Sequence, residues 1–370
     1  MSSRHPERLL LGPGPSNVDP KVMQAISAPI LGHLDPYFLE VMNDTSKLLK
    51  YVFQTKNKLT FPISGTGTSG IEAILTNIVE PKDEVIVLVT GYFGSRISDK
   101  ISRIGGKPII INSKLGSGIT HEIVEDHLKN SNANLIALVQ GETSAGVMQP
   151  VENIGKIAKK YDTLFFVDTV SSLGGCEFKM DAWNVDACST GSQKCLGAFS
   201  GVAPISINSK AYEKIINRSS KVPSFYLDLS LIEKYWSENP VYHHTAPTSL
   251  IYALKEALSI IKNEGLENCW ARHSESSQLL IKGIEKLNLN ILADIKYRLP
   301  TLTGVKLPSS IPEQEIRSYL LNSHNIEVGG GLGENKGKLL RIGLMGYNAN
   351  KNNVVKLLST IESFMKTVKK

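Results

Sequence analysis

Lys194 stands in an unusual setting for a lysine. It follows Thr190, Gly191, Ser192 and Gln193, and no other charged residue flanks it. Most lysines are surface cations, but this one comes directly after a segment with the composition of a buried strand. Burial would lower the pKa of the amine and make its neutral form available for Schiff-base chemistry.

A second candidate, Asp168, ends the apolar run TLFFVD (163–168) and precedes Lys194 by 26 positions. In an open α/β sheet, ligands bind beside the carboxyl ends of the strands. A carboxylate at such a position must be solvated or paired. Asp168 could instead cap a helix N-terminus, so by itself it leaves two interpretations open.

The third feature is the loop SGTGTSG (64–70), which lies between an apolar stretch and a helical segment. It matches the pattern G-x-G-x-x-G, but a dinucleotide site also needs an acidic residue at the end of the next strand. That strand ends in Thr90 and Gly91, which disfavours a dinucleotide. A hydroxyl-rich loop at a helix N-terminus can bind phosphate through backbone N–H groups. A tight turn without a ligand is the alternative.

Together, these three features match the needs of pyridoxal phosphate. This cofactor requires a phosphate site, a carboxylate facing its pyridine nitrogen, and a lysine that bonds its aldehyde carbon. Phe93, at the end of the run that begins at residue 84, is placed to stack on the ring.

The elements that position these residues alternate along the chain. Continuous apolar strands separated by amphipathic helices predict an α/β fold with a parallel sheet covered on both faces. The expected strands are 84–90, 107–112, 134–140, 163–168, 187–192 and 203–208, and the expected helices are 69–79, 93–105, 121–130 and 151–161. A long helix over 249–265, ending at Gly265, leads into a smaller α+β region. We therefore expect an N-terminal arm (1–20), a large domain (21–263) and a small C-terminal domain (264–370).

Composition narrows the classes of function. The 370 residues are 41 % apolar and carry a net charge of +6, without a basic stripe that would indicate nucleic-acid binding. The chain has no uninterrupted apolar run of roughly 18 residues, and its N-terminus lacks a secretion-signal pattern, so a cytoplasmic protein without a membrane partner is expected. The four cysteines form no CxxC pair, and His121 and His127 are not spaced as ligands on one helix face, so no metal site is expected.

The sequence resembles the alanine–glyoxylate / serine–pyruvate aminotransferases, class V pyridoxal-phosphate enzymes of fold type I. The resemblance covers nearly the whole chain. It is carried by the segments LLLGPGPSN (9–17), YVFQT (51–55), SGTGTSGIEAILTN (64–77), GETSAGVMQP (141–150), VDTVSSLGG (167–175), GSQKCLGA (191–198), SFYLD (224–228), YHHTAP (242–247), EGLENCW (264–270), GGLG (330–333) and LLRIGLMG (339–346).

The resemblance implies specific roles for the central residues. Lys194 would bind the cofactor covalently and move the proton between the substrate Cα and the cofactor, and Asp168 would pair with the pyridine nitrogen. Thr143 would form a hydrogen bond with the phenolic oxygen of the cofactor, while Val170 and Phe93 would pack on the two faces of the cofactor ring.

The resemblance also implies how the ends of the cofactor and substrate are bound. The phosphate site would comprise Thr66, Gly67, Thr68 and Gln193, together with Tyr242 and Thr245 of the partner subunit in a homodimer. Arg341 would bind the substrate carboxylate, with Ser16 and Asn17 near the same group. Many relatives carry histidine in place of Thr68 and tryptophan in place of Phe93, and both departures bear on substrate preference.

The expected activity is ping-pong transfer of an amino group from alanine or serine to glyoxylate or pyruvate. Other class V donors remain open, such as ureidoglycine, phosphonate-amine or kynurenine-type compounds. Cysteine desulfuration would require a nucleophilic cysteine in the C-terminal region, where only Cys269 is available. A non-catalytic binding protein of the same fold is a further alternative, but it would have to retain Lys194, Asp168 and Arg341 without using them.

Overall fold

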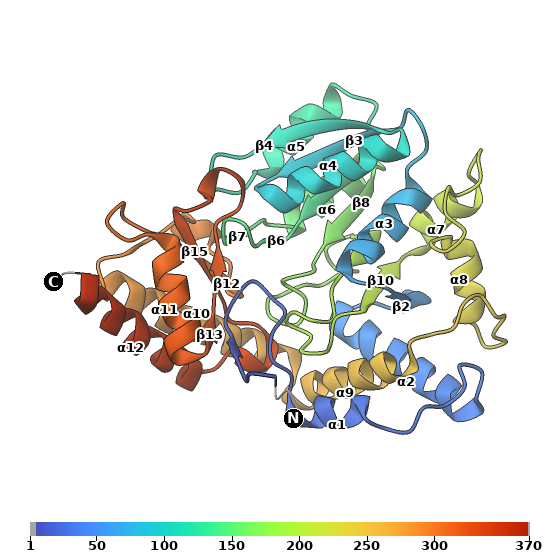
Figure 1. Ribbon diagram of the computed structural model, residues 1–370. Coiled ribbons are helices and arrows are strands. Elements are labelled where there is room, and N and C mark those ends of the chain that lie inside the picture. The colour runs from blue at the N-terminus through green and yellow to red at the C-terminus, as the bar shows by residue number, and fades with distance from the viewer. Residues whose placement is uncertain (1–4, 369–370) are drawn as a thin grey trace.

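The centre of the protein is a seven-stranded mixed sheet, seen here in a computed structural model that describes residues 5–368 (Figure 1). Its strands are β2 (Leu59–Ser64), β3 (Glu84–Val89), β4 (Lys107–Asn112), β5 (Leu135–Val139), β8 (Leu164–Asp168), β9 (Ala187–Ser189) and β10 (Val202–Ile207). They lie in the order β2-β10-β9-β8-β5-β3-β4. Only β10 runs antiparallel to its neighbours, so the expected mostly parallel sheet is confirmed.

Two details of the sheet differ from the sequence-based expectation. Strand β2 was not among the expected strands. The expected strand 187–192 is regular only through Ser189, although Thr190 N still donates to Pro204 O at 2.9 Å. Pro204 has no N–H to return a hydrogen bond to Thr190, so the regular antiparallel pairing ends at that position.

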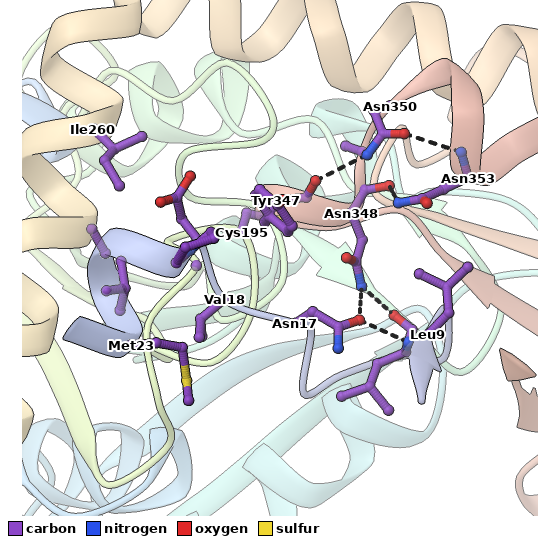
Figure 2. Close-up of a pocket in the computed structure, with 18 of the residues that line it drawn as sticks. Leu9, Asn17, Val18, Met23, Cys195, Ile260, Tyr347, Asn348, Asn350 and Asn353 are labelled. Atoms are coloured by element: carbon purple, nitrogen blue, oxygen red, sulfur yellow. Dashed lines mark hydrogen bonds between the residues drawn. The ribbon is translucent and has the colours of Figure 1, made fainter. Parts of the chain in front are cut away.

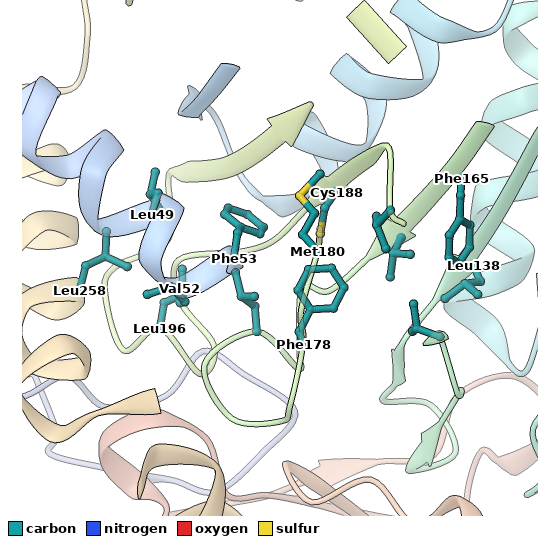
Figure 3. Close-up of a cluster of buried hydrophobic side chains, with 14 of the residues drawn as sticks. Leu49, Val52, Phe53, Leu138, Phe165, Phe178, Met180, Cys188, Leu196 and Leu258 are labelled. Carbon is teal, nitrogen blue, oxygen red and sulfur yellow. The ribbon is translucent and has the colours of Figure 1, made fainter. Parts of the chain in front are cut away.

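Helices cover both faces of the sheet because its strands alternate their apolar side chains. In β3, Ile86 and Leu88 face one core, whereas Val85 and Val87 face the other. The first core includes α1 (Pro20–Ile26), α2 (Pro36–Phe53), α5 (His121–Lys129), α6 (Glu152–Lys160) and α9 (Thr248–Glu264). The second includes α3 (Gly67–Ile78), α4 (Tyr92–Ile104), α7 (Ser209–Ile216) and α8 (Leu229–Tyr235). Figure 3 shows Phe53 of α2 and Leu258 of α9 in the first core.

A smaller antiparallel sheet lies in the C-terminal part of the chain. Its strands β11 (Asn290–Ile291), β12 (Leu302–Lys306), β15 (Leu339–Gly343) and β14 (Gly329–Gly330) are ordered β11-β12-β15-β14. Helices α10 (Leu266–Lys286), α11 (Glu313–His324) and α12 (Lys351–Val368) accompany it around a separate core. Only Gly265, at φ +86°, separates α9 from α10. The proposed boundary at residue 264 thus coincides with the junction of these two helices.

The N-terminal segment joins the C-terminal region before it enters the large sheet region. Strand β1 (Leu9–Leu10) pairs in parallel with β13 (Ile326–Glu327), and Gly343 N donates to Leu11 O at 2.9 Å. The chain then passes Lys194 and begins α1 at Pro20. The expected arm (1–20) includes four residues, and the expected small domain two residues, that lie outside the described part of the chain.

The remaining elements are short and connect the two regions. They are β6 (Gly141–Glu142), β7 (Val147–Met148) and the 3₁₀ helices η1 (Ile295–Tyr297), η2 (Gly333–Asn335) and η3 (Gly346–Asn348). Within residues 5–368, no helix combines the length and apolar character needed to cross a membrane. The same residues contain no group of three or more His, Cys, Asp or Glu side chains arranged to hold a metal ion.

Candidate active site

A cavity lies at the carboxyl end of the parallel strands and brings most of the predicted residues together. Its lining comes from the glycine loop after β2, one face of α4, and the segments that follow β5, β8 and β9. The predicted residues that line it are Thr66, Gly67, Thr68, Phe93, Thr143, Asp168, Val170, Gln193 and Lys194. This clustering arises because the carboxyl ends of parallel strands meet at one edge of the sheet.

Asp168 is the last residue of β8 and only 4 % exposed. Its Oδ1 accepts the Val170 N–H at 2.8 Å, which fixes the carboxylate at the cavity wall. Burial raises the pKa of Asp168 to about 7, and this hydrogen bond offsets part of the rise. Residues 169–175 form turns and an isolated bridge rather than a helix, so helix capping does not explain this residue.

Lys194 projects its amine into the same cavity, and its Nζ donates a hydrogen bond to Pro13 O of the N-terminal arm. Burial lowers the pKa of Lys194 to about 8, so much more of the amine is neutral near neutral pH than for an ordinary lysine. Gly14 packs directly against this side chain, since a Cβ there would overlap the end of the Lys194 side chain. The arm therefore restricts the space around the lysine.

The glycine loop opens α3 with its first backbone N–H groups available. Thr66 precedes the helix, and its side chain makes no capping hydrogen bond. A Cβ at Gly67 would lie 3.2 Å from Val170, so this position needs a very small residue. Gln193 also lines the cavity, and its buried Oε1 has no hydrogen-bond partner within the described residues. The N–H groups at the helix N-terminus and the Thr66 hydroxyl are donors that fit a phosphate group, to which the Gln193 amide can donate only through its Nε2.

Arg341 connects the C-terminal sheet to the rim of this cavity. It lies in β15 and is 7 % exposed. Its Nε donates to Gly330 O at 2.5 Å and its Nη1 to Thr143 O at 3.3 Å. Arg341 does not line the cavity itself, but Thr143, its partner, does. Burial lowers the pKa of Arg341, while Glu142 acts in the opposite direction.

Glu142 was assigned no role from the sequence, yet it organises the wall that carries Phe93. Its fully buried carboxylate accepts the backbone N–H groups of Phe93 (2.9 Å), Gly94 (3.1 Å) and Ser144 (3.0 Å). It therefore joins β6 to the first turn of α4, and burial raises its pKa. The only sequence signal was its place in GETSAGVMQP, because its contact with α4 is long-range.

Two arm residues are placed differently from one another. Ser16 N donates to Gln193 O at 3.1 Å and its Oγ to Lys194 O at 3.2 Å, so Ser16 contacts the backbone of the lysine loop. Asn17 instead lines a second cavity, between the arm, α9 and the start of α12 (Figure 2).

The amide of Asn17 is already engaged in contacts that hold the arm. Its Oδ1 accepts hydrogen bonds from Asn348 Nδ2 at 2.8 Å (Figure 2) and from Leu10 N at 2.9 Å. Its Nδ2 donates to Arg8 O at 2.9 Å. The side chain of Asn17 thus braces the arm, and Asn17 does not line the cavity that contains Lys194.

Tyr242 and Thr245 do not line the first cavity of their own chain. Both are exposed, Tyr242 by 58 %. The segment that carries them nevertheless lies against the glycine loop, because His244 Nε2 is 2.6 Å from Ser64 Oγ and the Tyr226 hydroxyl donates to Ser64 O at 2.9 Å. Tyr242 and Thr245 therefore lie on an exposed segment next to the glycine loop, outside the first cavity.

Comparison with known proteins agrees with this geometry. The model of the class-V aminotransferases matches residues 9–357. The alanine–glyoxylate aminotransferase of Mus musculus is 40 % identical over 94 % of this chain and 85 % of its own length. The (S)-ureidoglycine–glyoxylate transaminase of Bacillus subtilis is 36 % identical over 97 % of this chain and 91 % of its own length.

The solved structures show the same relationship in three dimensions. The crystal structure of an alanine–glyoxylate aminotransferase from Nostoc superposes with a TM-score of 0.97 at 45 % identity, covering 99 % of this chain and 97 % of the other. Its fold is that of the fold-type I pyridoxal-phosphate enzymes, which confirms the expected fold class. The chain therefore belongs to the class-V aminotransferases, in the family that includes the alanine–glyoxylate enzymes.

Proposed function

We propose that this aminotransferase binds pyridoxal phosphate at Lys194 and moves an amino group from alanine or serine to glyoxylate or pyruvate in a ping-pong cycle. The observation that carries the proposal is the cavity shared by the Lys194 amine, the Asp168 carboxylate and the glycine loop. Class-V aminotransferases depend on this cofactor, and relatives are named for alanine and glyoxylate.

The residues present fit each part of the cofactor. Thr66, Gly67, Thr68 and Gln193 would hold the phosphate, using the N–H groups at the α3 N-terminus, the threonine hydroxyls and the Gln193 Nε2 donor. Asp168 would face the pyridine nitrogen, and Thr143 the phenolic oxygen. Phe93 and Val170 would pack on the faces of the ring. Once bound, the cofactor supplies an electron sink for the pair left on the substrate Cα when its proton is removed.

The chain's own residues would perform the binding and proton-transfer steps. The neutral Lys194 amine can accept the proton from the substrate Cα, because burial lowers its pKa to about 8. The Arg341 guanidinium would bind the substrate carboxylate through two parallel N–H groups. Phe93 is held at its place by Glu142, which accepts its backbone N–H.

We further propose a homodimer in which Tyr242 and Thr245 complete the phosphate site of the partner subunit. An exposed aromatic cluster supports this assembly. Phe225 is 71 % exposed and stacks on His243, and the Tyr242 ring lies 5.2 Å from that of His33. Exposed aromatic clusters of this kind are typical of protein interfaces. Two-fold symmetry would make both sites equivalent.

A desulfurase-like activity is a weaker candidate for this chain. Cys269 lies in α10, is 1 % exposed and packs in the first core. Burial raises its pKa to about 12, so little of the thiolate needed as a nucleophile would form near neutral pH. The other three cysteines are buried as well.

A donor-by-acceptor panel at saturating pyridoxal phosphate tests the proposed reaction. Alanine and serine are expected to be the best donors with glyoxylate or pyruvate, and ureidoglycine, aminophosphonate and kynurenine-type donors are the informative competitors. Each half-reaction should proceed without the second substrate, as a ping-pong cycle requires. A clear preference for ureidoglycine would contradict the proposed donor class but not the aminotransferase assignment.

A further inference from the structure

One face of α4 supplies a whole side of the cofactor cavity. Phe93, Arg96, Ile97 and Lys100 all line the cavity, at the three- and four-residue spacing that places side chains on one helix face. The first three provide an aromatic ring, an exposed guanidinium and an apolar chain. The fourth is a lysine that is only 7 % exposed, which is rare for an ammonium group.

The buried amine of Lys100 is poorly satisfied by its own surroundings. Its Nζ makes one long hydrogen bond, to Arg96 O at 3.4 Å. Within the described part of the chain, no carboxylate oxygen lies within 4.0 Å of this nitrogen. A buried ammonium group has three N–H donors to satisfy. Lys100 makes one hydrogen bond and lines the cavity, so we expect a further electrostatic partner for its amine at this cavity.

The charged groups around Lys100 identify its partner. Arg96 and Asp99 of α4, Glu72 of α3 and Asp168 of β8 all act on Lys100, and burial lowers its pKa. Arg96, a cation, and Asp168 line the same cavity, whereas Glu72 and Asp99 do not, so Asp168 is the carboxylate that shares the cavity with Lys100.

Seen from Asp168, the facing charged and titratable groups are Glu142 of β6, Lys100 of α4, Lys194 and the Cys188 thiol of β9. Lys100 and Lys194 both favour the ionised form of Asp168, and Glu142 opposes them.

We propose that Lys100 is a positioning residue for Asp168: it keeps this carboxylate ionised and thereby holds the shared proton on the pyridine nitrogen of the cofactor. The inference rests on the proposed binding of pyridoxal phosphate. It assigns Lys100 a role through Asp168, without contact between Lys100 and the substrate.

The physical reason is the position of the cation relative to the proton. The proton between Asp168 and a pyridine nitrogen can reside on nitrogen, leaving a carboxylate, or on the carboxyl group, leaving a neutral ring. A cation on the carboxylate side stabilises the first arrangement. Burial and the nearby Glu142 favour the second, and the charge of Lys100 acts against them. A protonated ring nitrogen is the better electron sink.

The first test measures how binding of pyridoxal phosphate to the cofactor-free full chain depends on pH. Lys100→Met, which keeps the apolar stem and removes the charge, should move the midpoint of binding upward by roughly one pH unit. Lys100→Arg should restore the wild-type midpoint. Arg103→Met is the matched control, because Arg103 is an exposed cation of the same helix paired with Asp99, and it should leave the midpoint unchanged.

The second test follows the proton directly, by ¹⁵N NMR of the holoenzyme loaded with ring-¹⁵N pyridoxal phosphate. In Lys100→Met the resonance should move toward that of a neutral pyridine, and in Lys100→Arg it should not. The pH shift should also vanish in an Asp168→Asn background, as a double-mutant cycle requires if Lys100 acts through Asp168.

The outcomes separate the two proposals. If wild type binds no pyridoxal phosphate, the proposed function fails. If wild type binds it, but Lys100→Met shifts neither the midpoint nor the resonance, only the role of Lys100 is overturned. A shift that persists in the Asp168→Asn background also overturns it. Should Lys100→Met unfold, Lys100→Gln with a thermal-unfolding check replaces it, and the same shifts are required.

Discussion

The amine of Lys194 donates a hydrogen bond to the carbonyl oxygen of Pro13, a residue 181 positions earlier in the chain. The N-terminal arm therefore closes over the lysine that we propose binds the cofactor. The arm is itself anchored to the C-terminal region through β1 and β13. One segment thus connects the small sheet, the lysine and the start of the large sheet region, so the conformation of the arm bears directly on the cavity.

Gly14→Ala should interfere with cofactor binding. A Cβ at this position would overlap the end of the Lys194 side chain and displace its amine, and φ of +104° is already unfavourable for alanine. We expect weaker binding of pyridoxal phosphate, measured by absorbance titration of the cofactor-free protein. Gly337→Ala is the control: Gly337 has φ of +78° but nothing within 4 Å, so it carries backbone strain without the clash. Equal losses in both variants would mean that backbone strain alone is responsible.

Lys194→Ala should abolish covalent attachment of pyridoxal phosphate and lose transamination while the protein remains folded. The expectation follows from the position of Lys194 in the cavity and from its pKa of about 8, caused by burial. Borohydride reduction of the loaded wild-type enzyme, followed by peptide mapping, should place the label on Lys194. A label on Lys100, the other lysine of the cavity, would show that the assignment is wrong.

Asp168 should make the cofactor-free protein less stable as pH rises. Burial raises its folded-state pKa to about 7 from 3.8, so between these values the folded state binds more protons than the unfolded state. The free energy of unfolding should therefore fall with increasing pH across this window. The fall is at most about 4 kcal/mol, since one pKa unit corresponds to about 1.4 kcal/mol.

Asp168→Asn should remove this component. Subtracting the pH profile of its unfolding free energy from that of wild type isolates the contribution of Asp168. A flat difference profile between pH 4 and 7 would contradict the raised pKa. The loaded variant should also lose activity by orders of magnitude, because its amide does not hold a proton on the ring nitrogen as a carboxylate does, whereas Asp168→Glu should retain more activity.

Arg341→Lys should be a poor enzyme even though the charge is kept, because a lysine lacks the planar fork that binds a carboxylate through two bonds. We expect a loss of about 2 to 4 kcal/mol of transition-state stabilisation, roughly 30- to 1,000-fold in kcat/KM for an amino acid. An amine without a carboxylate should be a weak substrate whose turnover the substitution leaves unchanged. If both substrates lose equally, Arg341 acts through its bonds to Gly330 and Thr143.

Mixed dimers test whether Tyr242 and Thr245 serve the partner's site. One chain carries Lys194→Ala and the other carries Tyr242→Phe with Thr245→Ala. If the contacts cross the dimer, one site collects every substitution and the other is wild type, so activity near half of normal per dimer should return. If they stay within one chain, each site keeps a lesion and no activity returns.

Two controls make the mixed-dimer result decisive. The Tyr242→Phe, Thr245→Ala protein must be impaired by itself at limiting cofactor, and mass spectrometry must confirm that mixed dimers formed. With both satisfied, absence of recovery would reject the shared site and leave the assignment of Lys194 intact.

The sequence by itself determined the parts of this protein that depend on local order. Apolar runs defined β3, β5 and β8 to within a residue at either end, because buried parallel strands are continuously apolar. The same kind of run defined β4, although this strand lies at the edge of the sheet and is partly exposed. Asp168, Lys194 and the glycine loop were identifiable because each directly follows an apolar run or opens a helix. The rule that strand ends meet at one sheet edge then predicted that they would share a site.

Only the tertiary structure decided which distant residues reach that site. Lys194 donates a hydrogen bond to Pro13 O, and Glu142 accepts one from the start of α4; both contacts join segments that no local pattern relates. The burial of Lys100 is likewise visible only in the packed structure. Asn17 illustrates the converse, since it lies in the same short motif as Ser16 but turns its amide into the arm. Side chains that are neighbours in the sequence can point to different surroundings. The burial of a side chain and its hydrogen-bond partners, which set its charge and pKa, are decided by how the chain packs and not by the order of its residues.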